Sequence, residues 1–130
     1  YLTSGWYWDM DDESRKWAER FNEKHKRMPS FLQAGDYSAA SFYLRGVKET
    51  GTDDPDSIMK WMKSNKITDF FAKNGYVRED GRMIYDMYLV QVKKPDESKR
   101  AWDYYNIVER LPGDKVYGSL EESTCKLVKK

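Results

Sequence analysis

A two-residue turn signal, Asp80-Gly81, constrains the fold of this chain more than any other feature. It separates residues 76–79 from the long run 82–93, and an Asp-Gly pair between two such runs is the strongest short-range sign of a β-hairpin. The second arm is apolar on both of its alternating faces, which is typical of a central strand covered on both sides. The sequence therefore predicts a hairpin whose second strand lies inside a sheet.

Two helices ahead of the hairpin carry clear start signals. The first covers about residues 12–27, and Asp11 or Asp12 can cap it by accepting bonds from its free N–H groups. The other, which is the third helix predicted along the chain, begins at Asp54-Pro55, where a capping residue is followed by proline at the first helical position. Both helices have an apolar stripe at helical spacing, so each is expected to lie on a core.

A second helix is predicted between these two, over residues 37–50, with Asp36 as its N-cap and Gly51 at its end. Residues 31–34 before it are expected to be short and extended. The apolar side of this helix is expected to consist of Ala39, Ala40, Tyr43, Leu44 and Val47.

Strands are predicted at residues 2–8 and within 98–110. The second of these also fits a helical period, but its aromatic and β-branched residues favour a strand. Residues 67–73 are expected to form a further helical turn, and the tail from Leu120 a short helix. Strands and helices alternate through the first half, which predicts an α/β fold.

Composition excludes several functions. The 23 basic and 22 acidic residues nearly cancel, and no basic stripe marks a nucleic-acid partner. No apolar run approaches the roughly 20 residues that span a bilayer. There is no N-terminal signal pattern, and because Tyr1 is not a natural start residue we expect that an upstream part has been removed. The chain has 20 aromatic residues (5 Trp, 10 Tyr, 5 Phe), and we expect most in the core and a few at a ligand.

The residues offer little for catalysis or metal binding. His25 is the single histidine and lies on an apolar helical stripe, so a triad has no obvious base. With Cys125 as the single cysteine, no common zinc site can form. The chain is therefore expected not to be an enzyme and to need no metal or cofactor. A glycosidase using Asp86 and Glu109 is an alternative, although nothing places these acids at catalytic spacing.

The first candidate binding site is Trp6-Tyr7-Trp8, at the end of the first predicted strand. Adjacent strand residues face opposite ways, so we expect at least one of these rings to face a cleft, solvent or a partner. Ligands of open α/β sheets sit beyond the carboxyl ends of strands, where this segment would lie. Core packing remains the alternative for Tyr7.

The second candidate site is Asp36-Tyr37-Ser38, at a predicted helix start. Free N–H groups and the helix dipole at such a position favour an anionic group such as a carboxylate. Capping by Asp36 is the alternative to direct ligand contact. Tyr37 is the better contact candidate, because it has both a ring and a hydroxyl.

Motifs spread along the chain resemble one family, the type I periplasmic solute-binding proteins of ABC transporters, in particular the C-terminal part of the branched-chain amino acid and amide receptors. The matching pieces are Asp36-Tyr37-Ser38-Ala39-Ala40, IMKWMKSNKITDFFAKNG, YVREDGRMIYDMYLVQVKKPDESK, WDYYNIVERLPG and SLEESTCKLVKK. The short first motif is weak alone, whereas the long central string with its tail is specific.

The resemblance implies a portion of a two-lobed fold, with helices flanking a mainly parallel sheet and three crossovers between the lobes. Residues from 1 to about 33 and 82–130 would belong to the second lobe, and about 35–80 to the first. The binding residues named above would lie near the hinge side of the cleft. An amino acid, amide or aromatic acid would be clamped there in the periplasm and delivered to a membrane permease.

Three further expectations accompany the resemblance. The N-terminal majority of the receptor would be absent, so the isolated chain is expected to be an oligomer, as in a swapped dimer, or to associate with the missing part. A ligand-sensing domain of a signalling receptor with the same fold is the alternative function. Cys125 is expected to be a free thiol, with pairing to a missing cysteine as its alternative.

Overall fold

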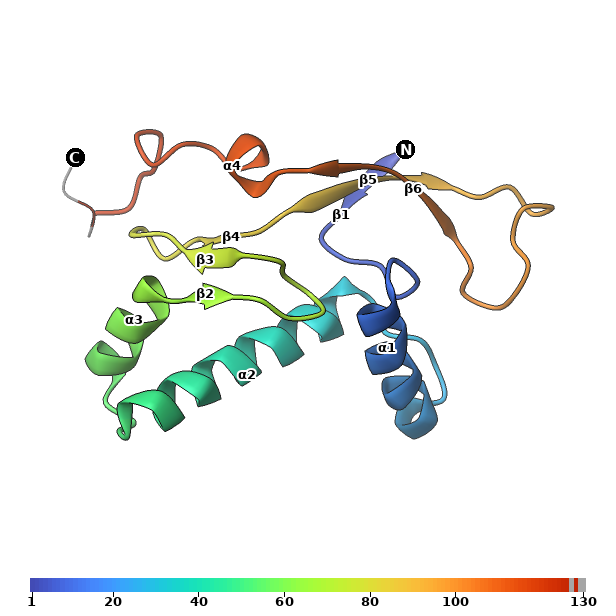
Figure 1. Ribbon diagram of the computed structural model, residues 1–130. Helices are drawn as coiled ribbons and strands as arrows, with labels where there is room; N and C mark the ends of the chain where they lie inside the picture. Colours follow the sequence, from blue (N-terminus) through green and yellow to red (C-terminus); the bar gives the residue numbers. More distant parts are fainter. Residues whose placement is uncertain (127, 129–130) are drawn as a thin grey trace.

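The structure is a computed structural model of the chain, and it describes residues 1–126 and 128. Its elements are β1 (Leu2–Ser4), α1 (Asp12–His25), α2 (Phe31–Thr50), α3 (Pro55–Ser64), β2 (Lys66–Ile67), β3 (Gly75–Val77), β4 (Met83–Ile84), β5 (Met87–Val92), β6 (Tyr105–Leu111) and α4 (Gly113–Val116). The three longer helices lie along one side of the molecule and the strands along the other (Figure 1). After α4 the chain runs back towards the β3–β4 hairpin (Figure 1).

The strands form two three-stranded sheets, ordered β1-β5-β6 and β2-β3-β4. Every strand pair among the described residues is antiparallel, so the expectation of a mainly parallel sheet is wrong for this chain. Parallel neighbours need a helical crossover that returns to the same sheet. Here the three helices between β1 and β2 lead from one sheet to the other, so they do not connect two parallel strands of the same sheet.

The predicted hairpin is confirmed, with Asp80-Gly81 between β3 and β4 and Gly81 at a φ of 83°. Its long second arm is divided, however, because Tyr85 and Asp86 separate β4 from β5, which belong to different sheets. The Asp86 carboxylate accepts a hydrogen bond from the Gly113 N–H at 2.9 Å and pairs with Arg110. These contacts hold the segment between the sheets. Strand β5 is central in its own sheet, as predicted, but it is not covered on both sides, because Gln91 and Val92 are exposed.

Helix α2 begins six residues earlier than predicted. Ser30 is its N-cap, and Ser30 and Gln33 form a capping box in which the Ser30 N–H donates to Gln33 Oε1 at 2.8 Å. Residues 31–34 are therefore helical rather than extended. The prediction of Asp36 as the cap is wrong, because the Ser30 box satisfies the free N–H groups one and a half turns earlier.

Other local signals had mixed outcomes. Asp11 caps α1 by accepting from the Ser14 N–H, and Asp54 caps α3 ahead of Pro55, as predicted. Residues 67–73 contain no helical turn and hold the end of β2 and a series of bends. No helix follows Leu120 among the described residues, and the rest of that predicted helix falls on 127 and 129–130, which lie outside them. The strand within 98–110 is confirmed as β6.

The main core lies where the 6–8 segment, α1, α2 and the bends after β2 meet. It consists of the buried residues Trp6, Tyr7, Trp8, Trp17, Ala18, Ala34, Phe42, Ile67, Phe71 and Ala72. Large rings dominate this set, so the high aromatic content serves the core first, as predicted.

Candidate functional site

The Trp6-Tyr7-Trp8 segment is not a strand. Strand β1 ends at Ser4, and the chain then turns, so the alternation of strand side chains does not apply. All three rings are buried, with exposed fractions of 2%, 7% and 4%. Strand alternation therefore gives no reason for one of these rings to face a cleft, solvent or a partner, although all three residues border a small pocket.

Each ring of this segment also donates a hydrogen bond. Trp6 Nε1–H donates to Ser14 Oγ at 2.9 Å. Tyr7 Oη–H and Trp8 Nε1–H both donate to the carbonyl oxygen of Trp102 at 2.9 Å. Burial raises the pKa of the Tyr7 phenol, which keeps it a neutral donor. Trp102 has a φ of 63°, an uncommon conformation for a bulky residue, and these two bonds hold its carbonyl in place.

A small, largely apolar pocket of about 170 Å³ borders this segment. Its walls come from β1, from residues 28–31 between α1 and α2, and from residues 102–105 before β6. Trp6, Tyr7 and Trp8 all line it. The pocket can hold a group of about the size of one ring, and it offers no charged side chain to orient it.

A larger groove of about 410 Å³ lies between α1 and α2, and we call it the α1–α2 groove. It is lined by Trp17, Arg20, Phe21, Lys24, His25, Gln33 and Tyr37. The Trp17 ring stacks on Phe70 with centroids 4.6 Å apart and lies 5.5 Å from the Tyr37 ring. Trp6 packs edge-on behind Trp17 at 5.6 Å, so it supports the groove wall without lining it.

The α1–α2 groove is cationic at its rim. Within the described part of the chain, neither Arg20 nor Lys24 forms an ion pair, and no residue lining the groove carries a carboxylate. Lys24 and His25 also lie in the last turn of α1, where positive charge complements the helix dipole. Arg20 lies one turn earlier and is exposed. Such a surface combines aromatic walls with positive charge, which suits an apolar or planar body that bears an anionic group.

The structure separates the predicted site residues. Tyr37 is half exposed and lines the α1–α2 groove, whereas Asp36 is exposed inside α2, away from any helix end. Ser38 is buried, and its hydroxyl donates to Asp69 Oδ2 at 2.6 Å. The predicted helix-start anion site near Asp36 does not form, because residue 36 lies inside α2.

Of the groove residues, Tyr37 was the one predicted to contact a ligand: the apolar stripe of the first helix was expected to lie on a core, and Arg20, Lys24 and Gln33 were not singled out. A signal for them exists in the sequence, because positions 17, 20, 21 and 24 recur at the three- and four-residue spacing of one helix face. That spacing cannot tell a face that packs against the core from one that lines a groove.

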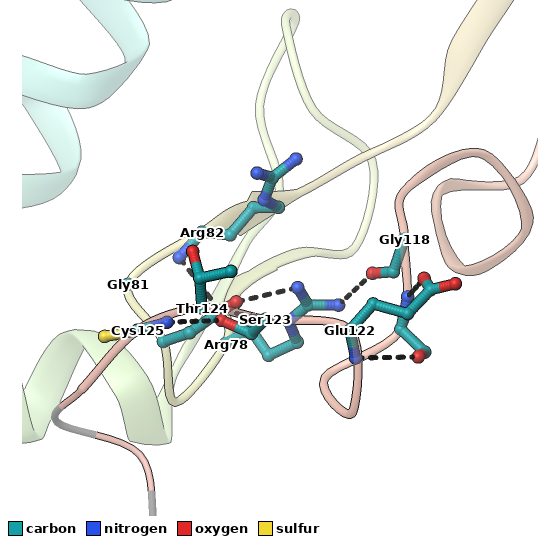
Figure 2. A pocket seen from close by; sticks show the side chains of 10 residues that line it. Arg78, Gly81, Arg82, Gly118, Glu122, Ser123, Thr124 and Cys125 are labelled. Carbon is teal, nitrogen blue, oxygen red and sulfur yellow. Dashed lines mark hydrogen bonds and ion pairs between the residues drawn. The ribbon is translucent and has the colours of Figure 1, made fainter.

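Another cavity, of about 480 Å³, lies between the β3–β4 hairpin and the segment after α4 (Figure 2). The Arg78 guanidinium donates to both carboxylate oxygens of Asp80, at 3.0 and 2.8 Å, and to the Gly118 carbonyl at 2.7 Å (Figure 2). This pairing holds the pKa of the Asp80 carboxyl well below its usual range. The central charges of this cavity are thus compensated internally, which makes it a weaker ligand candidate than the α1–α2 groove.

Neither a metal site nor a membrane span was found in the described residues. No group of three or more His, Cys, Asp or Glu side chains among them could hold a metal ion. No helix among them has the length and apolar character needed to cross a membrane. Cys125 is a free thiol in the structure.

Comparison with solved structures gives extensive matches. A periplasmic binding protein from Burkholderia mallei is 51% identical, with a TM-score of 0.94, over 98% of this chain and 34% of its own. A branched chain amino acid ABC transporter periplasmic ligand-binding protein from Burkholderia xenovorans is 41% identical, with a TM-score of 0.93, over 96% of this chain and 33% of its own. An amino acid ABC transporter substrate-binding protein from Pseudomonas fluorescens shares the fold, with a TM-score of 0.82 at 18% identity, and its match covers 97% of this chain and 33% of its own.

This chain therefore spans about a third of the length of the solved relatives that it matches. No curated protein sequence matches it. A family profile described as "Periplasmic binding protein" matches residues 1–99, which is most of the chain. These findings confirm the resemblance, the portion of a two-lobed α/β fold and the periplasmic location that it implied. On this evidence the chain belongs to the periplasmic binding protein family.

Proposed function

We propose that this chain is part of the ligand-binding receptor of an ABC transporter, which binds a small organic solute between two lobes and delivers it to a membrane permease. The support comes from the Burkholderia xenovorans relative, whose description names a branched chain amino acid transporter. Because this chain spans a third of such a protein, the remaining contacts to the solute would come from residues outside it.

The observation that carries this proposal is the α1–α2 groove. It places Tyr37, the predicted contact residue, beside the Trp17 ring and opposite the unpaired cations Arg20 and Lys24. A solute with a carboxylate and an apolar or aromatic body, such as an amino acid or an aromatic acid, matches these surfaces. In this reading Trp6 supports the wall through Trp17, and Tyr7, Trp8 and Ser38 hold the surrounding elements through their hydrogen bonds rather than touching the solute. Asp36 is exposed on α2 and does not line the groove.

The division into lobes stays a prediction. It is supported by the two separate sheets, because β1, β5 and β6 come from the parts assigned to the second lobe and β2 and β3 from the part assigned to the first. Strand β4 was also assigned to the second lobe but pairs with β3, so we move the proposed boundary from residue 82 to the end of β4. The residues between β4 and β5, Tyr85 and Asp86, would then form one crossover between the lobes. Binding in such a receptor is hinge closure on a solute, without bond chemistry.

Calorimetry on the complete protein that contains this chain tests the proposal. L-leucine, L-phenylalanine, benzoate and acetamide are titrated into the wild type and into Tyr37→Ala and Arg20→Ala. We expect at least one carboxylate probe to bind, and each substitution to weaken it about tenfold, as for the loss of one charge-assisted or aromatic contact. Arg27→Ala, which removes an exposed arginine outside the groove, is the matched control and should bind as the wild type does.

Two results would contradict the proposal. One is the absence of binding for all four probes and for a wider panel of amino acids, amides and aromatic acids. The other is turnover of any probe, which would make the protein an enzyme. Equal losses in Arg20→Ala and Arg27→Ala would keep the receptor function but remove the groove as its site.

A further inference from the structure

Helix α2 has two apolar faces, and the chain covers one of them. The covered face consists of Ala34, Ser38, Phe42 and Gly46, which follow each other at four-residue spacing and are all buried. It packs tightly on α3: a Cβ added at Gly46 would lie 3.1 Å from the Trp61 ring. This face alone is enough to anchor α2 in the fold.

The opposite face of α2, which we call the outer face, points to solvent. It is formed by Leu32, Asp36, Ala39, Ala40, Tyr43 and Leu44. Leu32 and Leu44 are 60% and 63% exposed, and Tyr43 is 44% exposed. Asp36 is the single charged residue of this set. The sequence predicted Ala39, Ala40, Tyr43 and Leu44 as the buried side of the helix, and the structure buries the other side instead.

An outer face of this kind is unusual for a helix that meets water. Surface helices normally place charged and polar residues opposite their buried stripe, and a helix that is apolar all round is normally buried all round. Contiguous exposed apolar surface of this sort commonly marks a contact with another protein surface. The small side chains of Ala39 and Ala40 would let another backbone approach closely in the middle of the face.

The length of the solved relatives indicates what covers the outer face. The Burkholderia mallei relative superposes on this chain with a TM-score of 0.94, yet the chain covers 34% of it, so about two-thirds of such a receptor lies outside the matched part. We propose that the outer face of α2 is the docking surface for that remaining part of the receptor. The inference rests on the proposed two-lobed receptor, and it does not depend on which solute the receptor binds.

One substitution measured in two contexts tests this inference. Leu44→Glu is made in the 130-residue chain and in the complete protein that contains it. In the chain, measured at a concentration at which sedimentation shows a monomer, Leu44 is exposed, so the melting temperature should change by no more than about 2 °C. In the complete protein the new carboxylate would be buried without a partner, and the melting temperature should fall by about 5 °C or more.

Lys60→Glu is the matched control, because it introduces the same carboxylate at an exposed position of α3 that is already charged. It should change the melting temperature little in either context. Sedimentation of the isolated chain gives a second readout. If the uncovered outer face makes the wild-type chain associate, Leu44→Glu should abolish that association and Lys60→Glu should not.

Several outcomes would overturn the inference. The same small shift in both contexts for Leu44→Glu would mean that the outer face stays in water. A shift for Lys60→Glu in the complete protein equal to that for Leu44→Glu would mean that the effect is not specific to this face. A complete protein that is a dimer and becomes a monomer on Leu44→Glu would assign the face to a second copy. Failure of solute binding would end the proposed function without changing these melts.

Discussion

The Asp69 carboxylate organises the turn that supports the α1–α2 groove, and Asp69→Ala is the sharpest test of that packing. Asp69 Oδ1 accepts from the backbone N–H groups of Phe71 and Ala72, each at 2.8 Å, and Oδ2 accepts from the Ser38 hydroxyl at 2.6 Å. This turn presents Phe70 to the Trp17 ring that lines the groove. The substitution removes all three hydrogen bonds at once.

The magnitude follows from which groups lose a partner. Phe71 and Ala72 are buried, so their N–H groups would be left without these acceptors. An unsatisfied buried group costs about 1–3 kcal/mol. Counting two such groups at the lower part of that range, we expect a loss of about 3 kcal/mol in the free energy of unfolding. For a chain of this length 1 kcal/mol shifts the melting temperature by roughly 3–5 °C, so the shift should be about 10 °C.

The assay is urea and thermal unfolding followed by circular dichroism at one fixed chain concentration, because association changes apparent stability. Ser38→Ala removes one of the three bonds and should cost about 1 kcal/mol. Asp53→Ala, on the exposed turn before α3, should stay within about 0.5 kcal/mol of the wild type. The reasoning is refuted if Asp69→Ala is no more destabilising than Ser38→Ala.

Two further predictions concern acid stability and a close backbone approach. Lys93 donates to Asp103 at 2.5 Å and lowers the pKa of that carboxyl. The ionised Asp103 carboxylate therefore contributes its full stabilisation above about pH 4. This stabilisation is lost as the pH falls through the lowered folded-state pKa. Asp103→Asn should therefore flatten the fall of the unfolding free energy below about pH 4 in urea titrations, and an unchanged acid slope would contradict this. A Cβ on Gly113 would lie 2.8 Å from the Tyr85 carbonyl oxygen, so Gly113→Ala should cost about 1–3 kcal/mol in the same melts. Exposed Lys115→Ala should be neutral, and equal melting temperatures for these two variants would argue against the close approach.

The elements that were predicted correctly depend on bonds between near neighbours. Asp11 and Asp54 each accept from an N–H three residues on, and the Asp80-Gly81 turn needs four residues to form. The start of α2 was missed although its signal was local too, since Ser30 and Gln33 have the spacing of a capping box. Asp36 was predicted as the N-cap instead, and the capping box at Ser30 starts the helix before it.

The candidate site was predicted in smaller part. Tyr37 does line a groove, and the proposal that it touches a ligand rests on that position. The Trp6-Tyr7-Trp8 segment was misjudged because β1 is shorter than its apolar run. Once the chain turns after Ser4, all three rings can reach the same core, and the Trp102 carbonyl, more than ninety residues away, binds two of them.

From the 130 residues alone follow the α/β class, the hairpin, the capped helices α1 and α3, and the family, because caps, turns and motif strings depend on residues close together in the chain. Tertiary packing settled which strands pair, where the long apolar run divides, and which face of α2 is buried. Those outcomes depend on contacts between distant residues. An apolar stripe predicts that a helix face will be buried, but it does not identify the element that buries it. The outer face of α2 shows the difference, since its residues predict burial and the described part of this chain leaves them exposed.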